Sequence, residues 1–537
     1  MVIFVVGILL LLPCIWSEMS VTGQDEYLLS LRTPMETLER GSWFVPWVNG
    51  EPRLKKPPLV YWVILLSYKL FGINLIAARL VGVLSGAGLA LCSCLLYREL
   101  FKKSGMLAGL ITLATVAVAI EGRRAMLDLP LAFFTSMAVY FALRWGKSGR
   151  LDWILLSAFS LGLSFLVKGP VGFIFFGAAA ITALFVFRKW RFAFSHWSQI
   201  VWALVLLLAV CAPWPLIMAH LWPNFLSVVG GEIAARRFGN IRVGSPLSTV
   251  GAALLLVFPW SVVLIAAVVR SVYYAQQTPA RKNLWLVAWF LGSIIPFFFM
   301  KSFERYLMPI IPAASVLCAN WLDEVEGILK TSLLRISITL IALVAVFFCL
   351  AFIWFAHGLP ITLMCLFFVG LMFWVTFARG DTHMAVGAVA VLLALIMGGL
   401  YPFMGINAMP RDLEKIVGHS PVVAYNSPQP SMLSIRLKRS VVRIHKKDIH
   451  LLKHFDGFVF MREIDAEGFE ALARELDIHY EKTGQFKTFY ARKTWVRFAR
   501  EDATLDDWKK AIKMRSMEDL QPSIYYYRVY PKIHPDE

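Results

Sequence analysis

Long apolar segments are the feature that most limits how this chain can fold. Of its 537 residues, 58% are hydrophobic and 16% are charged. Many of the apolar segments approach the roughly 20 residues that a helix needs to cross the hydrocarbon core of a bilayer. The sequence therefore predicts an α-helical, polytopic membrane protein.

We expect about thirteen transmembrane helices from these segments. The first, residues 2–16, has no small-x-small cleavage site before Ser17, so we interpret it as an uncleaved span. Residues 59–71 are too few for a span, which suits a re-entrant or interfacial helix. The other expected spans are residues 76–97, 106–120, 127–143, 153–167, 171–187, 200–219, 247–269, 284–300, 307–322, 332–355, 361–377 and 384–402.

The basic residues indicate the orientation of the chain. Clusters of Lys and Arg follow alternate apolar segments, as expected of cytoplasmic links. This places the N-terminus in the cytoplasm, and the loop 17–75 and the C-terminal part outside, in the periplasm of a Gram-negative cell. Topology also accounts for the net charge of +18, so we expect no nucleic acid partner.

The composition changes after the last apolar segment. The short β-branched or aromatic stretches SPVVAYNS, RSVVRIHK and FDGFVFM predict strands, and EGFEALARELDIHY has helical periodicity. We therefore expect two domains: a transmembrane domain of residues 1–403 and a small soluble α/β domain of residues 404–537 outside the membrane.

The cysteines and histidines do not indicate a cofactor. All seven cysteines fall in apolar segments without a CxxC motif. The histidines on the outer side show no HxxxH or HxH spacing. A divalent metal is possible, but the residues do not point to one.

The loop 17–75 carries the residues best suited to chemistry. It contains the acid pair Asp25-Glu26, an Asn49-Gly50 turn, and Lys55-Lys56 before two prolines. A carboxylate near the bilayer surface could accept a proton from an acceptor, and cations could stabilise a departing phosphate. Alternatively, the acids begin an interfacial helix and the lysines only anchor to lipid headgroups.

Three further charged residues lie at the outer ends of apolar segments: Asp128, Lys168 and Arg305. A charge that faces lipid costs about 2.5 to 3.5 kcal/mol at a helix centre. We therefore expect these side chains to share one polar cavity with the acid loop. The alternatives are that the cations reach the headgroups and that Asp128 caps its helix.

Five stretches together resemble a known superfamily: DEYLLSLRTPMETLERGSWFVPWVNGEPRLKKPPLVYW, FGINLIAARL, MLDLPLAFF, LGLSFLVKGP and ERYLMPIIPA. They are similar to the GT-C glycosyltransferases that use polyprenyl-phosphate sugars, in particular the bacterial aminoarabinose (ArnT-type) transferases, which are related to protein O-mannosyltransferases. The resemblance implies a GT-C-like helical fold.

The resemblance also implies roles for single residues. Asp25 corresponds to the catalytic carboxylate. Glu26 is the alternative for this role, because the distance from Asp25 to Gly41 is one residue longer than in relatives. Asp128 corresponds to the second acid of the cavity. Lys56 and Lys168 would bind the lipid phosphate, and Lys55, Arg305 and Tyr306 would lie beside it. The resemblance also implies that Lys55 replaces a glutamate that binds zinc in aminoarabinose transferases, so we expect no such zinc site in this chain.

The sequence therefore predicts an inverting glycosyltransferase of the inner membrane. Its donor would be a polyprenyl-phosphate sugar, and its acceptor a lipid such as lipid A, a glycan or a protein. One alternative is a transporter or flippase of lipid-linked sugars, for which we expect repeats with interrupted spans in matching positions. The other alternative is an inactive GT-C-fold partner that assembles envelope complexes.

Overall fold

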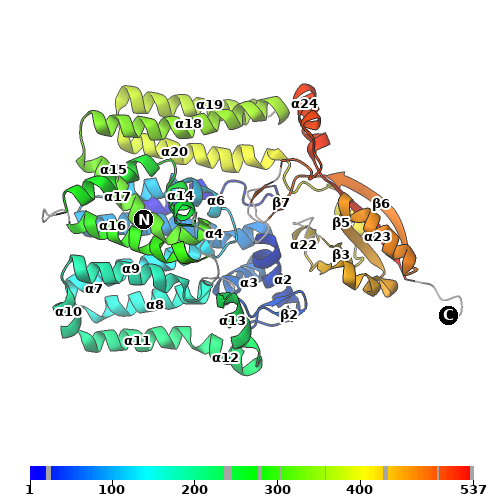
Figure 1. Ribbon diagram of the computed structural model, residues 1–537, viewed down its shortest axis with the longest axis horizontal. Coiled ribbons are helices and arrows are strands. Elements are labelled where there is room, and N and C mark those ends of the chain that lie inside the picture. Colours follow the sequence, from blue (N-terminus) through cyan, green and yellow to red (C-terminus); the bar gives the residue numbers. More distant parts are fainter. Residues whose placement is uncertain are drawn as a thin grey trace.

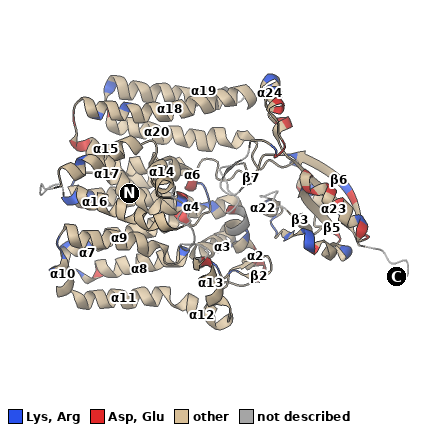
Figure 2. Ribbon diagram, in the orientation of Figure 1, with Lys and Arg blue, Asp and Glu red and all other residues tan. Residues whose placement is uncertain are grey.

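The computed structural model consists of a helical bundle with a small β-sheet beyond one of its ends (Figure 1). It describes residues 1–19, 26–234, 245–275, 281–300, 304–356, 359–426, 433–492, 495–496 and 498–531. Along the bundle the helices are almost free of charge, and Lys, Arg, Asp and Glu gather at their ends and on the sheet (Figure 2). This distribution is that of a multi-pass membrane protein.

Residues 26–71, which we call the outer loop after their expected location, form a folded unit that packs on the bundle. Helix α1 (Val2–Leu11) leads into it, and it contains η1 (Glu26–Leu31), α2 (Arg32–Glu39), strands β1 (Trp47–Val48) and β2 (Glu51–Pro52), and α3 (Leu59–Phe71). The expected turn joins β1 to β2, with positive φ at Asn49 and Gly50. Both of these amides donate to the Glu36 carboxylate, at 2.8 and 2.6 Å, so α2 holds the turn in place.

The bundle follows the outer loop. Its helical elements are α4 (Leu75–Phe101), α5 (Met106–Leu113), α6 (Val116–Glu121), α7 (Asp128–Ser148), α8 (Leu151–Lys168), α9 (Val171–Val186), α10 (Trp190–Ser195), α11 (Trp197–Cys211), α12 (Pro213–Leu221), α13 (Phe225–Ala234), α14 (Ser245–Val257), α15 (Ser261–Tyr273), α16 (Arg281–Ile294), η3 (Ile295–Phe299), η4 (Glu304–Ile310), α17 (Ile311–Glu324), α18 (Ile328–Ala356), α19 (Leu359–Trp374), η5 (Val375–Arg379), α20 (Thr382–Leu395), η6 (Ile396–Leu400) and η7 (Tyr401–Met404). In the part of the chain that the structure describes, seven helices are long and apolar enough to cross a membrane, or eight if a bent pair forms one span. The expected number of about thirteen stays a prediction.

Two expected spans are not continuous helices. Residues 106–120 divide into α5 and α6, because Thr115 caps α6 by accepting a hydrogen bond from the Val118 amide. Residues 247–269 divide into α14 and α15, which meet at a bend of 111°. Pro259 lies at this bend, where it cannot supply a backbone N–H to continue a helix. Neither segment is one continuous helix, and the expectation that each crosses the membrane stays a prediction.

The chain after η7 folds around a mixed sheet. Its elements are α21 (Leu413–Val417), β3 (Val422–Tyr425), α22 (Leu433–Arg436), β4 (Val442–Ile444), η8 (Lys446–His454), β5 (Gly457–Arg462), α23 (Glu463–Glu475), β6 (His479–Lys487), β7 (Ala491–Arg492), β8 (Trp495–Val496), α24 (Leu505–Met514), η9 (Glu518–Leu520) and β9 (Ser523–Tyr530). The strand order is β4-β3-β5-β9-β6. Strand β3 is parallel to β4 and β5, whereas β9 is antiparallel to β5 and β6. These elements combine helices with a mixed sheet, and the expected separate domain of residues 404–537 stays a prediction.

Hydrogen bonds hold the sheet-containing part to residues at one end of the bundle. Arg436 of α22 donates two hydrogen bonds of 2.6 Å to the Glu18 carboxylate. Ser440 bonds Glu39 at the end of α2, through its amide at 2.9 Å and its hydroxyl at 2.6 Å. The outer loop therefore lies between the bundle and the sheet (Figure 1).

Candidate active site

A compact cluster of charged side chains forms where α7, α8 and η4 meet. Asp128 begins α7 and Lys168 ends α8, and these helices form an antiparallel hairpin, so the two residues reach the same end of the bundle. The Lys168 ammonium pairs with Oδ1 of Asp128. Nε of Arg305, from η4, lies 3.2 Å from Oδ2 of the same carboxylate. All three side chains are at least 89% buried, so they face protein and not lipid.

Tyr306 completes this group, which we call the Asp128 cluster (Asp128, Lys168, Arg305 and Tyr306). The Lys168 ammonium lies 3.6 Å from the centre of the Tyr306 ring, a geometry for cation–π attraction. Asp128 lies in the first turn of α7, whose N-cap residue is Leu127, and its carboxylate contacts the two cations. The cluster brings two cations together at one carboxylate, and paired cations are suited to hold a phosphate.

The two lysines of the outer loop differ from each other. Lys56 is partly buried, and its ammonium lies 3.2 Å from Oε1 of Glu232 near the end of α13. Lys55 is exposed. The structure thus unites four of the predicted site residues in the Asp128 cluster, whereas Lys56 pairs with a carboxylate of another helix and Lys55 faces solvent.

Glu26 lies in a closed polar site that the sequence did not reveal. Its carboxylate and the Arg79 guanidinium are fully buried, with Nε 2.9 Å from Oε1 and Nη2 3.3 Å from Oε2. The Ala125 amide also donates to Oε1, at 2.9 Å. Arg79 further donates to the carbonyls of Ile15 and Ser17, at 3.0 and 2.8 Å. These bonds join α4 to the start of the outer loop.

The arrangement favours a positioning role for Glu26, because an enclosed carboxylate with these partners has little access to an acceptor. Asp25, the other candidate base, lies outside the described residues, directly before η1 in the chain. Arg79 stands in the FGINLIAARL stretch, and no role was predicted for it. The sequence did hold one indication of this pair: Arg79 lies inside an apolar segment, where an arginine without an acidic partner is energetically costly.

The Glu26–Arg79 pair leads to a stability prediction. Glu26→Gln leaves the Arg79 charge buried without its counter-ion, which typically costs about 3 to 5 kcal/mol. We expect a clear drop of the thermal unfolding midpoint in detergent. The matched double variant Glu26→Gln with Arg79→Met removes both charges and should recover most of that loss. An unchanged midpoint in the single variant would contradict this role.

The described residues do not fit a zinc site. Among them, no group of three or more His, Cys, Asp or Glu side chains could hold a metal ion. Lys55 is exposed, and its ammonium has no lone pair for a metal.

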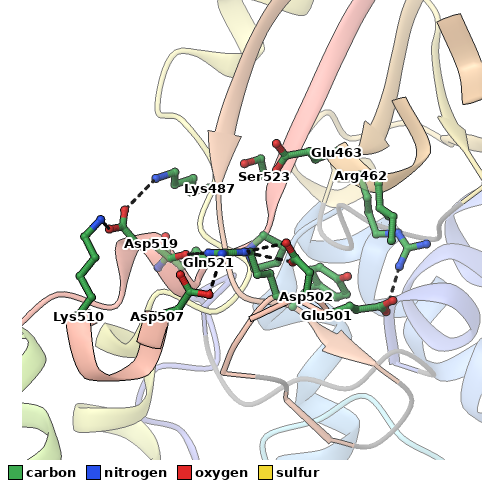
Figure 3. Close-up of a pocket in the computed structure, with 14 residues that line it drawn as sticks. Arg462, Glu463, Lys487, Glu501, Asp502, Asp507, Lys510, Asp519, Gln521 and Ser523 are labelled. Atoms are coloured by element: carbon green, nitrogen blue, oxygen red, sulfur yellow. Dashed lines mark hydrogen bonds and ion pairs between the residues drawn. The ribbon is translucent and has the colours of Figure 1, made fainter. Parts of the chain in front are cut away.

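A polar cavity of about 630 Å³ lies in the sheet-containing part (Figure 3), and none of its lining residues belongs to the Asp128 cluster. Its charges are matched: Arg500 bonds Asp507 at 3.0 Å, and Lys510 bonds Asp519 at 2.8 Å. The hydrogen bond from Lys510 lowers the pKa of Asp519. Because its cations are taken up by its own carboxylates, this cavity is a weaker candidate for a phosphate than the Asp128 cluster.

Sequence comparisons point to one group of membrane enzymes. The family model described as dolichyl-phosphate-mannose-protein mannosyltransferase matches residues 55–217. A relative from Pseudomonas aeruginosa (strain UCBPP-PA14), named undecaprenyl phosphate-alpha-4-amino-4-deoxy-L-arabinose arabinosyl transferase, is 26% identical over 57% of each chain. The protein of that name from Serratia proteamaculans (strain 568) is 25% identical over 76% of this chain and 78% of its own. The chain spans little more than half the length of the Pseudomonas relative and of an uncharacterised Aquifex aeolicus protein.

The solved structures agree with the fold. ArnT from Cupriavidus metallidurans bound to undecaprenyl phosphate superposes with a TM-score of 0.69 at 18% identity, covering 98% of this chain and 96% of that one. The expected GT-C-like helical fold is thereby confirmed, and the protein is a multi-pass membrane protein. In sequence and in fold the chain is similar to the ArnT proteins.

Proposed function

We propose that this protein is an inverting glycosyltransferase that moves a sugar from a polyprenyl phosphate to an acceptor. The observation that supports it best is the Asp128 cluster, in which two buried cations meet at one carboxylate in an ArnT-like fold. The acceptor would be a lipid such as lipid A, a glycan or a protein. The names of the relatives, and the lipid bound in the Cupriavidus structure, support the donor class.

In the proposed reaction the Asp25 carboxylate takes the proton of the acceptor hydroxyl. At the same time the acceptor oxygen forms a bond to the anomeric carbon of the sugar. The bond from that carbon to the phosphate oxygen breaks on the opposite side, and the lipid phosphate leaves with the electron pair. Lys168 and Arg305 stabilise the charge that develops on this phosphate, and Asp128 holds both cations in place. Attack opposite to the leaving group inverts the anomeric centre.

The lysines of the outer loop would take part in donor binding. Lys56 would exchange its pairing with Glu232 for the donor phosphate. Lys55, exposed beside it, would contact the same phosphate or neighbouring lipid headgroups. Tyr306 would keep the Lys168 ammonium in position through its ring.

We further propose that the reaction takes place on the outer face of the inner membrane. The N-terminus would be cytoplasmic, and the soluble part, residues 404–537, would be periplasmic. The positive-inside rule supports this orientation. The bonds from Arg436 to Glu18 and from Ser440 to Glu39 support placing the outer loop and the soluble part on one side.

A transfer assay tests this function. The full chain in lipid vesicles receives a panel of radiolabelled polyprenyl-phosphate sugars and an envelope extract, with Asp25→Asn as the control. We expect the label in the extract only with the unaltered protein. Labelled lipid that crosses the bilayer without transfer would instead identify a transporter. Neither transfer nor crossing with any donor would favour an inactive assembly partner.

A further inference from the structure

Helix α24 of the soluble part lies against the outer end of a membrane span. It runs across the ends of α18 and α19 and not along them (Figure 1). Near the end of α18, Nε1 of Trp354 donates a hydrogen bond of 3.0 Å to the Ile512 carbonyl. The Arg515 guanidinium, directly after α24, lies 4.4 Å from the centre of the Trp354 ring. A Trp at the end of a span marks the depth of the lipid headgroups, so α24 lies at that depth.

One side of α24 belongs to the core of the soluble part, and another carries exposed apolar side chains. Ala511 is buried next to Leu520, and Trp508 packs against the same cluster. In contrast, Leu505 is 79% exposed and Ile512 is 50% exposed. These two residues are seven positions apart, so they lie two turns apart on one face. The inward side is already packed, and this apolar face has no role in the core.

The charges next to this face are mainly basic. Residues 505–515 contain four cations, Lys509, Lys510, Lys513 and Arg515, and the two acids Asp506 and Asp507. Asp507 is committed to the start of the helix, where it bonds the Thr504 amide and hydroxyl at 2.8 and 2.9 Å. These bonds lower the pKa of Asp507. Lys509 and Lys513 lie beside the Leu505–Ile512 face and are exposed. The Lys509 ammonium lies 2.8 Å from Oδ1 of Asp506, in an exposed and therefore weak ion pair.

We propose that α24 is an interfacial anchor that binds the outer leaflet of the membrane crossed by the bundle. Leu505 and Ile512 enter the boundary between headgroups and acyl chains, and Lys509 and Lys513 contact anionic lipid phosphates. Helices with an apolar face and neighbouring basic residues bind membranes in this way, in the plane of the surface. The anchor adds a lipid contact to the protein contacts that hold the soluble part, and it does not depend on the proposed chemistry.

Fluorescence quenching in lipid tests the anchor. Leu505→Cys and Ile512→Cys are labelled with bimane in the full chain, in vesicles that contain phosphatidylglycerol and brominated phospholipid. The matched control is Ile464→Cys in α23, whose native side chain is 65% exposed. The protein without added cysteine corrects for its seven native thiols. We expect bromolipid quenching at residues 505 and 512 that exceeds the control by at least about twofold.

The other outcomes would each overturn the proposal. Quenching at residues 505 and 512 by aqueous iodide alone, equal to that of residue 464, would show that α24 is in water. Protection from both quenchers would show that a protein covers this face. Equal bromolipid quenching in vesicles without anionic lipid, or in Lys509→Gln with Lys513→Gln, would refute the contact with anionic headgroups.

Discussion

Replacing Asp25 with asparagine should abolish sugar transfer and leave the protein folded. The amide has nearly the shape of the carboxylate but cannot take the acceptor proton. A positioned general base typically contributes about 10²- to 10⁴-fold to the rate, so we expect kcat to fall by at least about 100-fold. The measurement is the initial rate of label transfer per folded molecule, with the thermal unfolding midpoint recorded for the same preparation.

The neighbouring acid provides the matched control, because Glu26→Gln makes the same chemical change one residue along the chain. Glu26 is buried against Arg79, so its loss should lower the unfolding midpoint and leave kcat per folded molecule largely intact. The opposite pattern would reverse the assignment. If Asp25→Asn stays active and Glu26→Gln is stable but inactive, Glu26 is the base.

The charged residues show what the sequence could predict about the site. Asp128, Lys168 and Arg305 each lie at an end of an apolar segment, and the cost of a charge in lipid predicts that such residues meet. The same energetic cost is avoided whichever residues pair, so it does not predict the individual pairs. The specific pairs, Lys168 and Arg305 on one carboxylate and Lys56 on Glu232, depend on how α7, α8, η4 and α13 pack. The packing of helices that are far apart in the chain cannot be predicted from the residues of a single sequence.

In the fold, too, single helices and strands could be predicted from nearby residues, whereas the pairing of distant strands could not. The limits of α3 coincide with the short apolar segment 59–71, and β3 and β5 form in β-branched or aromatic stretches, because these signals are local. The break at Pro259 was missed, since a hydropathy average runs through a single proline. The order β4-β3-β5-β9-β6 joins strands that are far apart in the chain, and residue periodicity does not encode such pairing.

Replacing Lys168 with alanine should weaken donor use more than any other change in the Asp128 cluster. Lys168 contacts both Asp128 and the ring of Tyr306, so its ammonium is held before the donor arrives. Removing one preorganised group that stabilises developing charge typically costs about 10²- to 10³-fold. We expect a loss of that size in kcat/KM for the polyprenyl-phosphate sugar, together with weaker competition by undecaprenyl phosphate.

Two variants separate this effect from loss of folding. Lys168→Arg keeps the charge and should retain part of the activity. Lys147 lies near the opposite end of α7, where it pairs with Glu99 at 2.9 Å, and Lys147→Ala should leave donor use unchanged. In Lys168→Ala the Asp128 carboxylate still has Arg305 at 3.2 Å, so the buried acid keeps a counter-ion and the fold should survive. If Lys168→Ala binds undecaprenyl phosphate normally and is only less stable, the Lys168–Asp128 pair is structural and the donor phosphate lies elsewhere.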